Sequence, residues 1–359
     1  MGLEKDKDMK IAFFSFYSGH VYRGVETFVH ELANRLVSLG NEVTVFQTGP
    51  ALGETVYKTQ VIKIPIDWSI SGSTQKGASY YTGCVKTFTQ EALRELNNGF
   101  DVVFPTNGKW QSLLCRIWAW RHRKKMIVSG QSGPGWDDRL NLFTFPDAFV
   151  AMTEYQAKWA QTANPFVRVD KIPNGVALEK FRTRKSLRSS KSSEPTILCV
   201  AAFVSWKRLN LAIKAVSKLN KVSLLLVGRG DQEKELRELG DELLPGRFDV
   251  IALPYAEMPD VYHKGSVFTF PTVPWESFGI AMVEAMASGL PVVATDDPIR
   301  REIVGDAGLF VDPENTEVYA KALEKALKTK WGDKPRRQAE KFSWDKIANQ
   351  YDQLFRDLV

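Results

Sequence analysis

Strand-like and helix-like segments alternate along almost the whole sequence, and this alternation limits the fold more than any other feature. In the first half, strand-like runs occupy residues 10–16, 42–48, 60–66, 101–106, 126–130 and 147–153. Helical segments lie between most of them. Several runs are almost continuously apolar, as are strands that are buried on both faces of a parallel sheet. The pattern predicts an α/β fold built on parallel sheets.

The alternation stops once and then resumes. Residues 182–195, RTRKSLRSSKSSEP, are polar, basic and rich in serine, and such a segment cannot build a core. Strand-like runs follow at 195–203, 222–228, 249–253, 266–272 and 291–295, with helices expected at 207–219, 231–243 and 278–288. We therefore expect two doubly wound, Rossmann-like domains, residues 1–177 and 178–341, that face each other across a cleft.

A last helical stretch, at about residues 343–358, places Trp344, Ile347, Tyr351 and Phe355 on one face. We expect residues 342–359 to form a helix that packs back towards the first domain.

Composition excludes several classes of protein. The net charge of +6 over 359 residues is too small to argue for nucleic acid as a partner. The sequence has no apolar run of about 20 residues that could span a membrane. The three cysteines, Cys84, Cys115 and Cys199, are too far apart to predict a disulfide framework or a zinc site. The charged start, MGLEKDKDMK, has no apolar signal segment. We expect a cytoplasmic protein.

The segment from Phe270 to Gly289, FPTVPWESFGIAMVEAMASG, carries the most chemical information. A strand is expected to end near its start, and a helix to begin near Phe278. Free amides and the helix dipole make such a helix start attractive to anions. Glu276 and Glu284 flank it, and carboxylates accept hydrogen bonds from hydroxyls. This combination suits a sugar nucleotide, although two carboxylates at this spacing can also have no joint role.

This segment resembles the donor-binding motif of the family 4 retaining glycosyltransferases, the glycosyl transferases group 1, which have the GT-B fold. The motif reads approximately P-S-x-x-E-G-F-G-x-x-x-x-E-A-M-A-x-G-x-P-V-V-A. This chain has Pro271, Glu276, Phe278, Gly279 and then EAMASGLPVVAT from Glu284. Further similar stretches are GVETFVHELANRLVSLGNEVTVF (24–46), IPNGVALEKF (172–181) and LLLVGRGDQEKEL (224–236). The resemblance therefore covers most of the chain.

The resemblance implies transfer of a hexose from a UDP- or GDP-linked sugar, with retention at the anomeric carbon and without a metal or a cofactor. The acceptor would be a hydroxyl of a saccharide, a lipid-linked molecule or a small molecule. By the same resemblance Glu276 contacts sugar hydroxyls, Glu284 binds the ribose diol, and Glu276 and Lys207 are catalytic. The implied donor-binding residues are Gly24, Lys207, Gly228, Leu253, Glu276, Ser277, Phe278, Gly279, Ile280 and Glu284.

The sequence departs from the family pattern around the leaving diphosphate. The family usually has an arginine and a lysine five residues apart, and here Lys207 matches the lysine while Ala202 stands at the arginine position. The first loop has Arg23 before Gly24 where the family has two glycines. One hypothesis is that Arg23 reaches the diphosphate and replaces the missing arginine. The alternative is that Arg23 faces solvent.

On the acceptor side, Gln131 stands where the family often has a histidine. Glutamine can bind a hydroxyl but cannot change its charge near neutral pH, so Gln131 is a candidate for binding only. His20 lies in the first loop and is a second acceptor-side candidate. Either side chain can equally be structural or exposed.

Residues 115–125, CRIWAWRHRKK, combine two tryptophans with basic residues. That mixture suits peripheral contact with anionic lipid on the inner face of a membrane. An ordinary helix with buried tryptophan and a basic end is the alternative.

Three other functions remain to be weighed. A catalytically weakened GT-B protein that only binds sugar nucleotides is conceivable because of Ala202. A GT-B hydrolase or epimerase would need its own acid and base groups, which the sequence does not reveal. A bilobal solute-binding protein would normally be exported, and no signal segment supports that.

Overall fold

The chain folds into two compact units, each described here by itself. The computed structural model describes residues 8–21, 24–51, 55–70, 72, 74–96, 99–181 and 194–359. Unit 1 comprises Met1–Asn174 and Trp344–Val359, and unit 2 comprises Gly175–Ser343. The sequence predicted boundaries after residues 177 and 341, against Asn174 and Ser343 in the structure.

Unit 1 is built on a seven-stranded, wholly parallel sheet with the order β3-β2-β1-β4-β5-β6-β7. Its strands are β1 (Lys10–Phe14), β2 (Glu42–Gln47), β3 (Lys58–Val61), β4 (Val102–Pro105), β5 (Lys125–Ser129), β6 (Ala148–Ala151) and β7 (Val169–Lys171). The run predicted as a strand at 60–66 pairs only as far as Val61, apart from one further bond from the Ile62 amide to the Gln47 carbonyl. Pro65 has no N–H group with which to continue the ladder.

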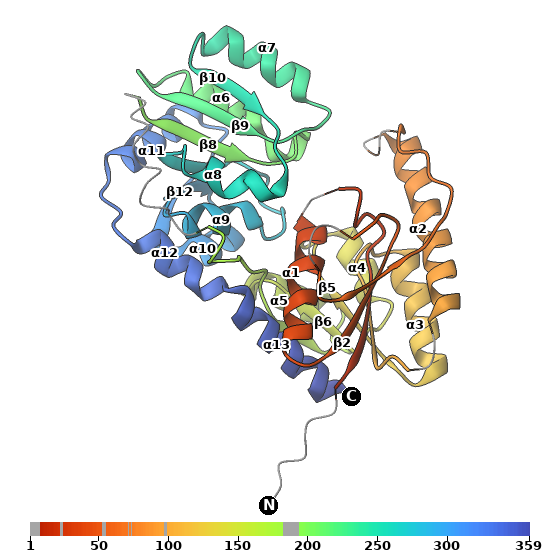
Figure 1. Ribbon diagram of the computed structural model, residues 1–359. Helices are drawn as coiled ribbons and strands as arrows, with labels where there is room; N and C mark the ends of the chain where they lie inside the picture. The colour runs from red at the N-terminus through yellow and green to blue at the C-terminus, as the bar shows by residue number, and fades with distance from the viewer. Residues whose placement is uncertain are drawn as a thin grey trace, which may run out of the picture. The chain divides into compact units, whose positions relative to one another are not determined.

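Six helices of the described residues belong to unit 1 and lie against its sheet (Figure 1). They are α1 (Gly24–Ser38), α2 (Gln75–Glu95), α3 (Trp110–His122), α4 (Trp136–Leu142), α5 (Glu154–Ala163) and α13 (Trp344–Leu358). Alternate residues of β1 point to opposite faces of the sheet. Phe14 accordingly joins the core beneath α2 and α3, whereas Phe13 stacks on Phe104, which also contacts Phe28 of α1.

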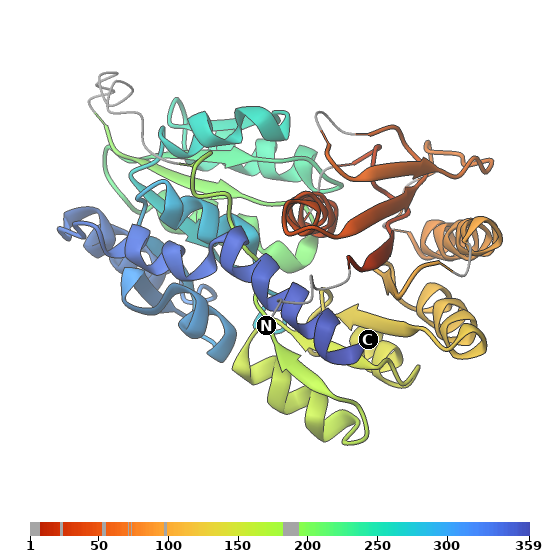
Figure 2. The same ribbon diagram turned by 60° about the horizontal axis from the view of Figure 1, so that its bottom comes forward.

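The C-terminal helix α13 packs against α1 within unit 1 (Figure 1 and Figure 2). Trp344, Ile347, Tyr351 and Phe355 are all buried. Tyr351 contacts Phe28 with ring centroids 5.8 Å apart, and Arg35 bonds Asp345 at 2.8 Å. The last sixteen residues of the chain thus complete the core of the first unit.

Unit 2 has a six-stranded parallel sheet with the order β10-β9-β8-β11-β12-β13. Its strands are β8 (Thr196–Val200), β9 (Ser223–Val227), β10 (Phe248–Ile251), β11 (Val267–Phe270), β12 (Val292–Thr295) and β13 (Gly308–Val311). Strands β8 and β11 lie side by side at the centre of the sheet, the point at which the strand order reverses. Ligands of doubly wound sheets bind outside such a point.

The helices of unit 2 are α6 (Leu209–Val216), α7 (Glu233–Leu243), α8 (Met258–Tyr262), α9 (Ile280–Ala287), α10 (Pro298–Val304), α11 (Thr316–Lys328) and α12 (Lys334–Ala339). Three predicted helix starts were each two residues too early, including that of α7, which was expected from 231 and begins at Glu233. The helix expected from 207 begins at Leu209, because Ser205–Lys207 is a 3-10 turn and Arg208 has a left-handed φ of 52°. The helix expected from Phe278 begins at Ile280, after Gly279 with a φ of 77°.

Two observed strands were not predicted from the sequence. Strand β7 is three residues of the sequence VDK, and β13 is GLFV. Neither has a long apolar or alternating run. Both are edge strands, and pairing with the one neighbouring strand places them in the sheet. Across the described residues, no helix combines the length and the hydropathy needed to span a bilayer.

Candidate functional site

Three loops leave the carboxyl ends of the central strands of unit 2: residues 201–208 after β8, 228–232 after β9 and 271–279 after β11. Because these strands are parallel neighbours, the loops share one edge of the sheet. Most of the predicted donor-binding residues are on them, namely Lys207, Gly228, Glu276, Ser277, Phe278 and Gly279. This edge is therefore the candidate site.

Lys207 and Glu276 meet in a close ion pair. The Lys207 Nζ lies 2.9 Å from the Glu276 Oε2, and their side chains are 14% and 16% exposed. The Thr272 hydroxyl lies 3.3 Å from the same carboxylate oxygen. The Lys207 ammonium is also 5.1 Å from the centre of the Phe270 ring. The pair places an acceptor for sugar hydroxyls beside a cation that attracts phosphate, in a largely desolvated position.

The start of α9 lies directly after this pair. Gly279 has a φ of 77°, which favours glycine, and a Cβ there would lie 2.9 Å from the end of the Met282 side chain and 3.0 Å from the Phe270 ring. The Phe278 side chain is buried and contacts Phe342, with ring centroids 5.6 Å apart. Phe278 can therefore contribute only backbone groups, while the first amides of α9, from Ile280, have no partner within the helix.

Glu284 is held inside unit 2 by a tyrosine that sequence reasoning missed. The Tyr262 hydroxyl donates to the Glu284 Oε2 at 2.7 Å, and both side chains are buried. Tyr262 in turn packs on Phe181, with ring centroids 5.6 Å apart. The bond from Tyr262 helps to orient the Glu284 carboxylate, a group that can accept several hydrogen bonds.

A buried arginine shapes the loop that carries Glu276. Arg300 is fully buried, and its Nε donates to the Asp297 Oδ2 at 2.7 Å. Asp297 also caps α10, accepting the amides of Ile299 and Arg300 at 2.9 Å each. The two Nη groups of Arg300 donate to four loop carbonyls: Glu276 (2.8 Å), Ser277 (3.0 Å), Val273 (3.2 Å) and Pro274 (2.7 Å). We call the Asp297–Arg300 pair the loop clasp.

The loop clasp satisfies every donor of the guanidinium, which has five N–H groups. Burial lowers the pKa of Arg300, and the adjacent Asp297 carboxylate opposes that effect. The sequence signals part of this arrangement, because Asp297 before Pro298 is a helix-start signal. No local pattern indicates that Arg300 would reach back to the loop at 273–277.

Arg208 fastens the loops at 201–208 and 271–279 to each other. Its Nε donates to the Pro271 carbonyl at 2.8 Å, and its Nη2 donates to the Thr272 carbonyl at 2.6 Å. Its Nη1 pairs with Glu314 at 3.0 Å. The side chain can turn this way because Arg208 precedes α6 with a left-handed φ instead of lying within the helix.

The other two predicted donor residues of unit 2 lie on neighbouring strand ends. Gly228 follows β9, and a Cβ there would lie 1.9 Å from the Ala201 carbonyl oxygen. The two loops can approach this closely only because the residue is glycine. Leu253 follows β10 and is exposed, as a contact for a base would be.

The predicted residues of unit 1 are placed as follows. The Gln131 and Asn174 side chains exchange two hydrogen bonds, at 3.1 and 3.0 Å. His20 is exposed, and its ring centroid lies 4.3 Å from that of Trp68. Gly24 is the first residue of α1, and Arg23 lies outside the described residues.

A buried carboxyl supports the segment that follows Gln131. Gln156 donates to Asp138 at 3.1 Å and also to the Gly130 carbonyl at 2.7 Å. Burial raises the pKa of Asp138 to about 8, against the hydrogen bonds that favour its charged form. The buried carboxyl accepts the Gln156 bond and so holds this segment in place.

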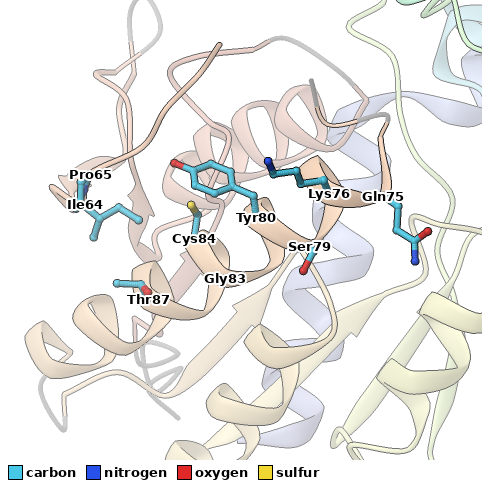
Figure 3. Close-up of a pocket in the computed structure, with 9 residues that line it drawn as sticks. All are labelled: Ile64, Pro65, Gln75, Lys76, Ser79, Tyr80, Gly83, Cys84 and Thr87. Carbon is cyan, nitrogen blue, oxygen red and sulfur yellow. The ribbon is translucent and has the colours of Figure 1, made fainter. Parts of the chain in front are cut away.

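A groove of about 750 Å³ lies on unit 1, between α2 and the segment after β3 (Figure 3). Tyr80 and Cys84 point from α2 towards Ile64 and Pro65. The lining residues are Ile64, Pro65, Gln75, Lys76, Ser79, Tyr80, Gly83, Cys84 and Thr87. All of these residues belong to unit 1.

No group of three or more His, Cys, Asp or Glu side chains within the described residues is arranged to hold a metal ion. The three cysteines are free and buried.

Two family models match the chain in succession. The model described as Glycosyltransferase Family 4 matches residues 22–180, and the model described as Glycosyl transferases group 1 matches residues 181–343. Together they cover most of the sequence and meet close to the boundary between the units.

Curated relatives include an exopolysaccharide phosphotransferase of Streptomyces coelicolor. It is 31% identical over 295 residues, which are 75% of this chain but 30% of that protein. The phosphatidyl-myo-inositol mannosyltransferase of Mycobacterium leprae is 25% identical over 95% of both chains. That of Mycolicibacterium smegmatis is 28% identical over 214 residues, 56% of this chain and 55% of the relative. The chain thus spans less than two thirds of two of these relatives.

Solved structures resemble the whole chain. HepE of Anabaena, in complex with UDP and glucose, has a TM-score of 0.78 at 17% identity and covers 97% of this chain and 99% of its own. Sucrose-phosphate synthase of Thermosynechococcus elongatus has a TM-score of 0.79 at 19% identity, with 98% and 99% coverage. These similarities confirm the expected fold of two Rossmann-like domains.

Proposed function

We propose a reaction for this chain, which belongs to the glycosyltransferases of family 4 and group 1 and has their GT-B fold. It transfers a hexose from a UDP- or GDP-linked sugar to a hydroxyl of a saccharide, a lipid-linked acceptor or a small molecule. The anomeric configuration is retained, and the transfer needs no metal.

The ion pair between Lys207 and Glu276 carries this proposal. It stands beside the amides at the start of α9, on the same edge of the sheet as Gly228. The leaving diphosphate gains negative charge as the glycosidic bond breaks, so a fixed ammonium and backbone amides stabilise the transition state. Glu276 then accepts hydrogen bonds from sugar hydroxyls, and Glu284 accepts those of the ribose diol.

The relatives support the choice of substrates. HepE was solved with UDP and glucose, and the mycobacterial relatives are mannosyltransferases of phosphatidyl-myo-inositol. A hexose donor and a lipid-linked acceptor therefore stand first among the substrates to be tested here.

Nucleotide binding gives the first test. We expect one of UDP, GDP or ADP, or one of their hexose conjugates, to raise the melting temperature without added metal. At 100 times its dissociation constant, a ligand stabilises the fold by about 2.7 kcal/mol. The Glu284→Gln variant should lose most of this shift, because the amide is a poorer partner for a ribose diol. The absence of any shift, with or without Mg²⁺, would contradict donor binding.

A catalytically weakened protein that only binds sugar nucleotides is the second candidate, and Ala202 favours it because that position offers no cation. Turnover separates the two functions. Transfer of hexose to any member of an acceptor panel supports the transferase. It is measured as the nucleoside diphosphate formed in the presence of that acceptor. Tight binding without turnover on that panel supports the weakened protein.

We also propose that α3 contacts anionic lipid, through a surface that differs from the predicted one. Trp118 is buried and stacks on His122, with ring centroids 4.5 Å apart. The exposed apolar side chains of α3 instead form a stripe at helical spacing: Trp110, Leu113, Ile117 and Trp120. Arg121 and Arg123, which are exposed, lie at the end of this stripe.

Vesicle cosedimentation checks this contact. We expect the Trp120→Ala variant to bind vesicles with 30% phosphatidylglycerol at least threefold more weakly than wild type, because an interfacial tryptophan is lost. Trp136→Ala is the matched control, since Trp120 and Trp136 are each 76% exposed. Wild-type binding that does not depend on anionic lipid, or equal losses in both variants, would contradict the proposal.

A further inference from the structure

The cations at the candidate site of unit 2 are not equally available to bind a diphosphate. In the described loops after β8, β9 and β11 the cations are Lys207, Arg208 and Arg229. Lys207 is paired with Glu276, and Arg208 is bonded to carbonyls and Glu314. Arg229 is exposed, and within the described part of the chain it has no acidic partner. A diphosphate carries at least two negative charges, so Lys207 alone leaves it incompletely balanced.

Arg229 lies directly beside the position at which an expected arginine is absent. Strands β8 and β9 run parallel in register, with Val200 opposite Val227. Beyond them the loops stay paired, because the Phe203 amide donates to the Arg229 carbonyl at 2.8 Å. Residue 229 is thus level with residues 202 and 203. At Ala202, which is exposed, only a methyl group occupies the place of a long side chain.

The glycines on both sides of Arg229 allow its backbone to lie directly against the loop after β8. A Cβ at Gly228 would lie 1.9 Å from the Ala201 carbonyl oxygen, and one at Gly230 would lie 2.4 Å from that of Phe203. The Gln232 amide also donates to the Phe203 carbonyl at 3.0 Å. Arg229 therefore projects from a rigid double loop and not from a mobile tip.

We propose that Arg229 supplies the second cation for the leaving diphosphate, from the loop after β9, in place of the residue at position 202. This inference rests on the proposed function. As the bond between C1 and the diphosphate oxygen breaks, its electron pair stays on the diphosphate. The acceptor hydroxyl oxygen bonds to C1, and its proton passes to the released diphosphate. Arg229 stays protonated throughout and donates to the phosphate oxygens in the bidentate manner that suits a guanidinium.

The test moves the cation from one loop to the other. For Arg229→Ala we expect kcat to fall about 10- to 100-fold, the range for the loss of one charged hydrogen bond. Affinity for UDP or GDP, whichever stabilises wild type, should fall about 10-fold, while affinity for the free nucleoside stays unchanged. The double variant Ala202→Arg/Arg229→Ala should recover at least 10-fold in kcat. Arg237→Ala, an exposed arginine of α7, is the matched control and should behave as wild type.

The other outcomes overturn the inference in distinguishable ways. Wild-type kcat in Arg229→Ala would exclude Arg229 from the reaction and leave the proposed function intact. An equal loss of nucleoside and nucleotide affinity, without rescue by Ala202→Arg, would show a structural role only. If Arg229→Ala does not fold, Arg229→Gln, which keeps a polar side chain without the charge, is measured instead. Wild type that binds no nucleotide would overturn the proposed function together with this inference.

Discussion

The Arg300→Met variant should lose about 3–5 kcal/mol of unfolding free energy, the cost of removing one partner from a buried ion pair. Methionine fills a similar space but removes the donor to the Asp297 Oδ2 and to four loop carbonyls. Urea denaturation followed by circular dichroism measures this loss. The nucleotide-induced shift should shrink as well, because the loop clasp shapes the loop that carries Glu276.

The neighbouring arginine provides the control for this loss. Arg301 is exposed and pairs with Asp296 at 2.5 Å, so Arg301→Met should change stability by less than about 0.5 kcal/mol. Arg300→Lys retains a charge but provides three N–H donors for five acceptors, and it should fall between wild type and Arg300→Met. An Arg300→Met protein as stable as Arg301→Met would show that the clasp contributes little.

Loss of the Lys207 ammonium should reduce kcat about 100- to 1000-fold, the range seen when one preorganised transition-state donor is removed. Lys207→Met keeps an unbranched side chain of similar length but removes the ammonium that lies over the Phe270 ring and pairs with Glu276. Steady-state release of the nucleoside diphosphate measures this effect. Lys214→Met, an exposed lysine on α6, should leave kcat within about twofold of wild type.

A double-mutant cycle with Glu276→Gln separates catalysis from simple charge balance. Lys207→Met alone leaves the Glu276 carboxylate without its ion-pair partner, so the double variant should regain stability relative to Lys207→Met. Its kcat should remain low, because the cation is still missing. If the double variant regained activity as well, Lys207 would act only by neutralising Glu276.

Regular local patterns account for what could be predicted of the fold. Strands such as β1, β4 and β9 are apolar runs between helical segments, and a parallel sheet buries such runs on both faces. Strands β7 and β13 were not predicted because they are short, and pairing with a neighbouring strand determines their positions. The start of α9 was misplaced by two residues because the left-handed φ of Gly279 is visible only in three dimensions.

The residues of the candidate site also fall into those that the sequence predicted and those that it missed. Glu276, Gly279 and Glu284 lie within nine residues of each other, so their spacing along a loop and a helix could be read directly. Tyr262 comes from a helix 22 residues before its partner Glu284, and no sequence spacing indicated it. The hypothesis for Arg23 remains a prediction, since that residue lies outside the described part of the chain.

By itself the sequence determined two parallel α/β units and the motif that carries both glutamates. These features depend on hydrophobic period and on helix-start chemistry, which act over a few residues. Only the tertiary structure decided that Lys207 pairs with Glu276, that Arg300 holds the loop at 273–277 and that Arg229 lies beside Ala202. These groups are distant in the chain and are brought together by the order of the strands. A buried polar group needs a hydrogen-bond partner, and the tertiary packing decides which residue that partner is.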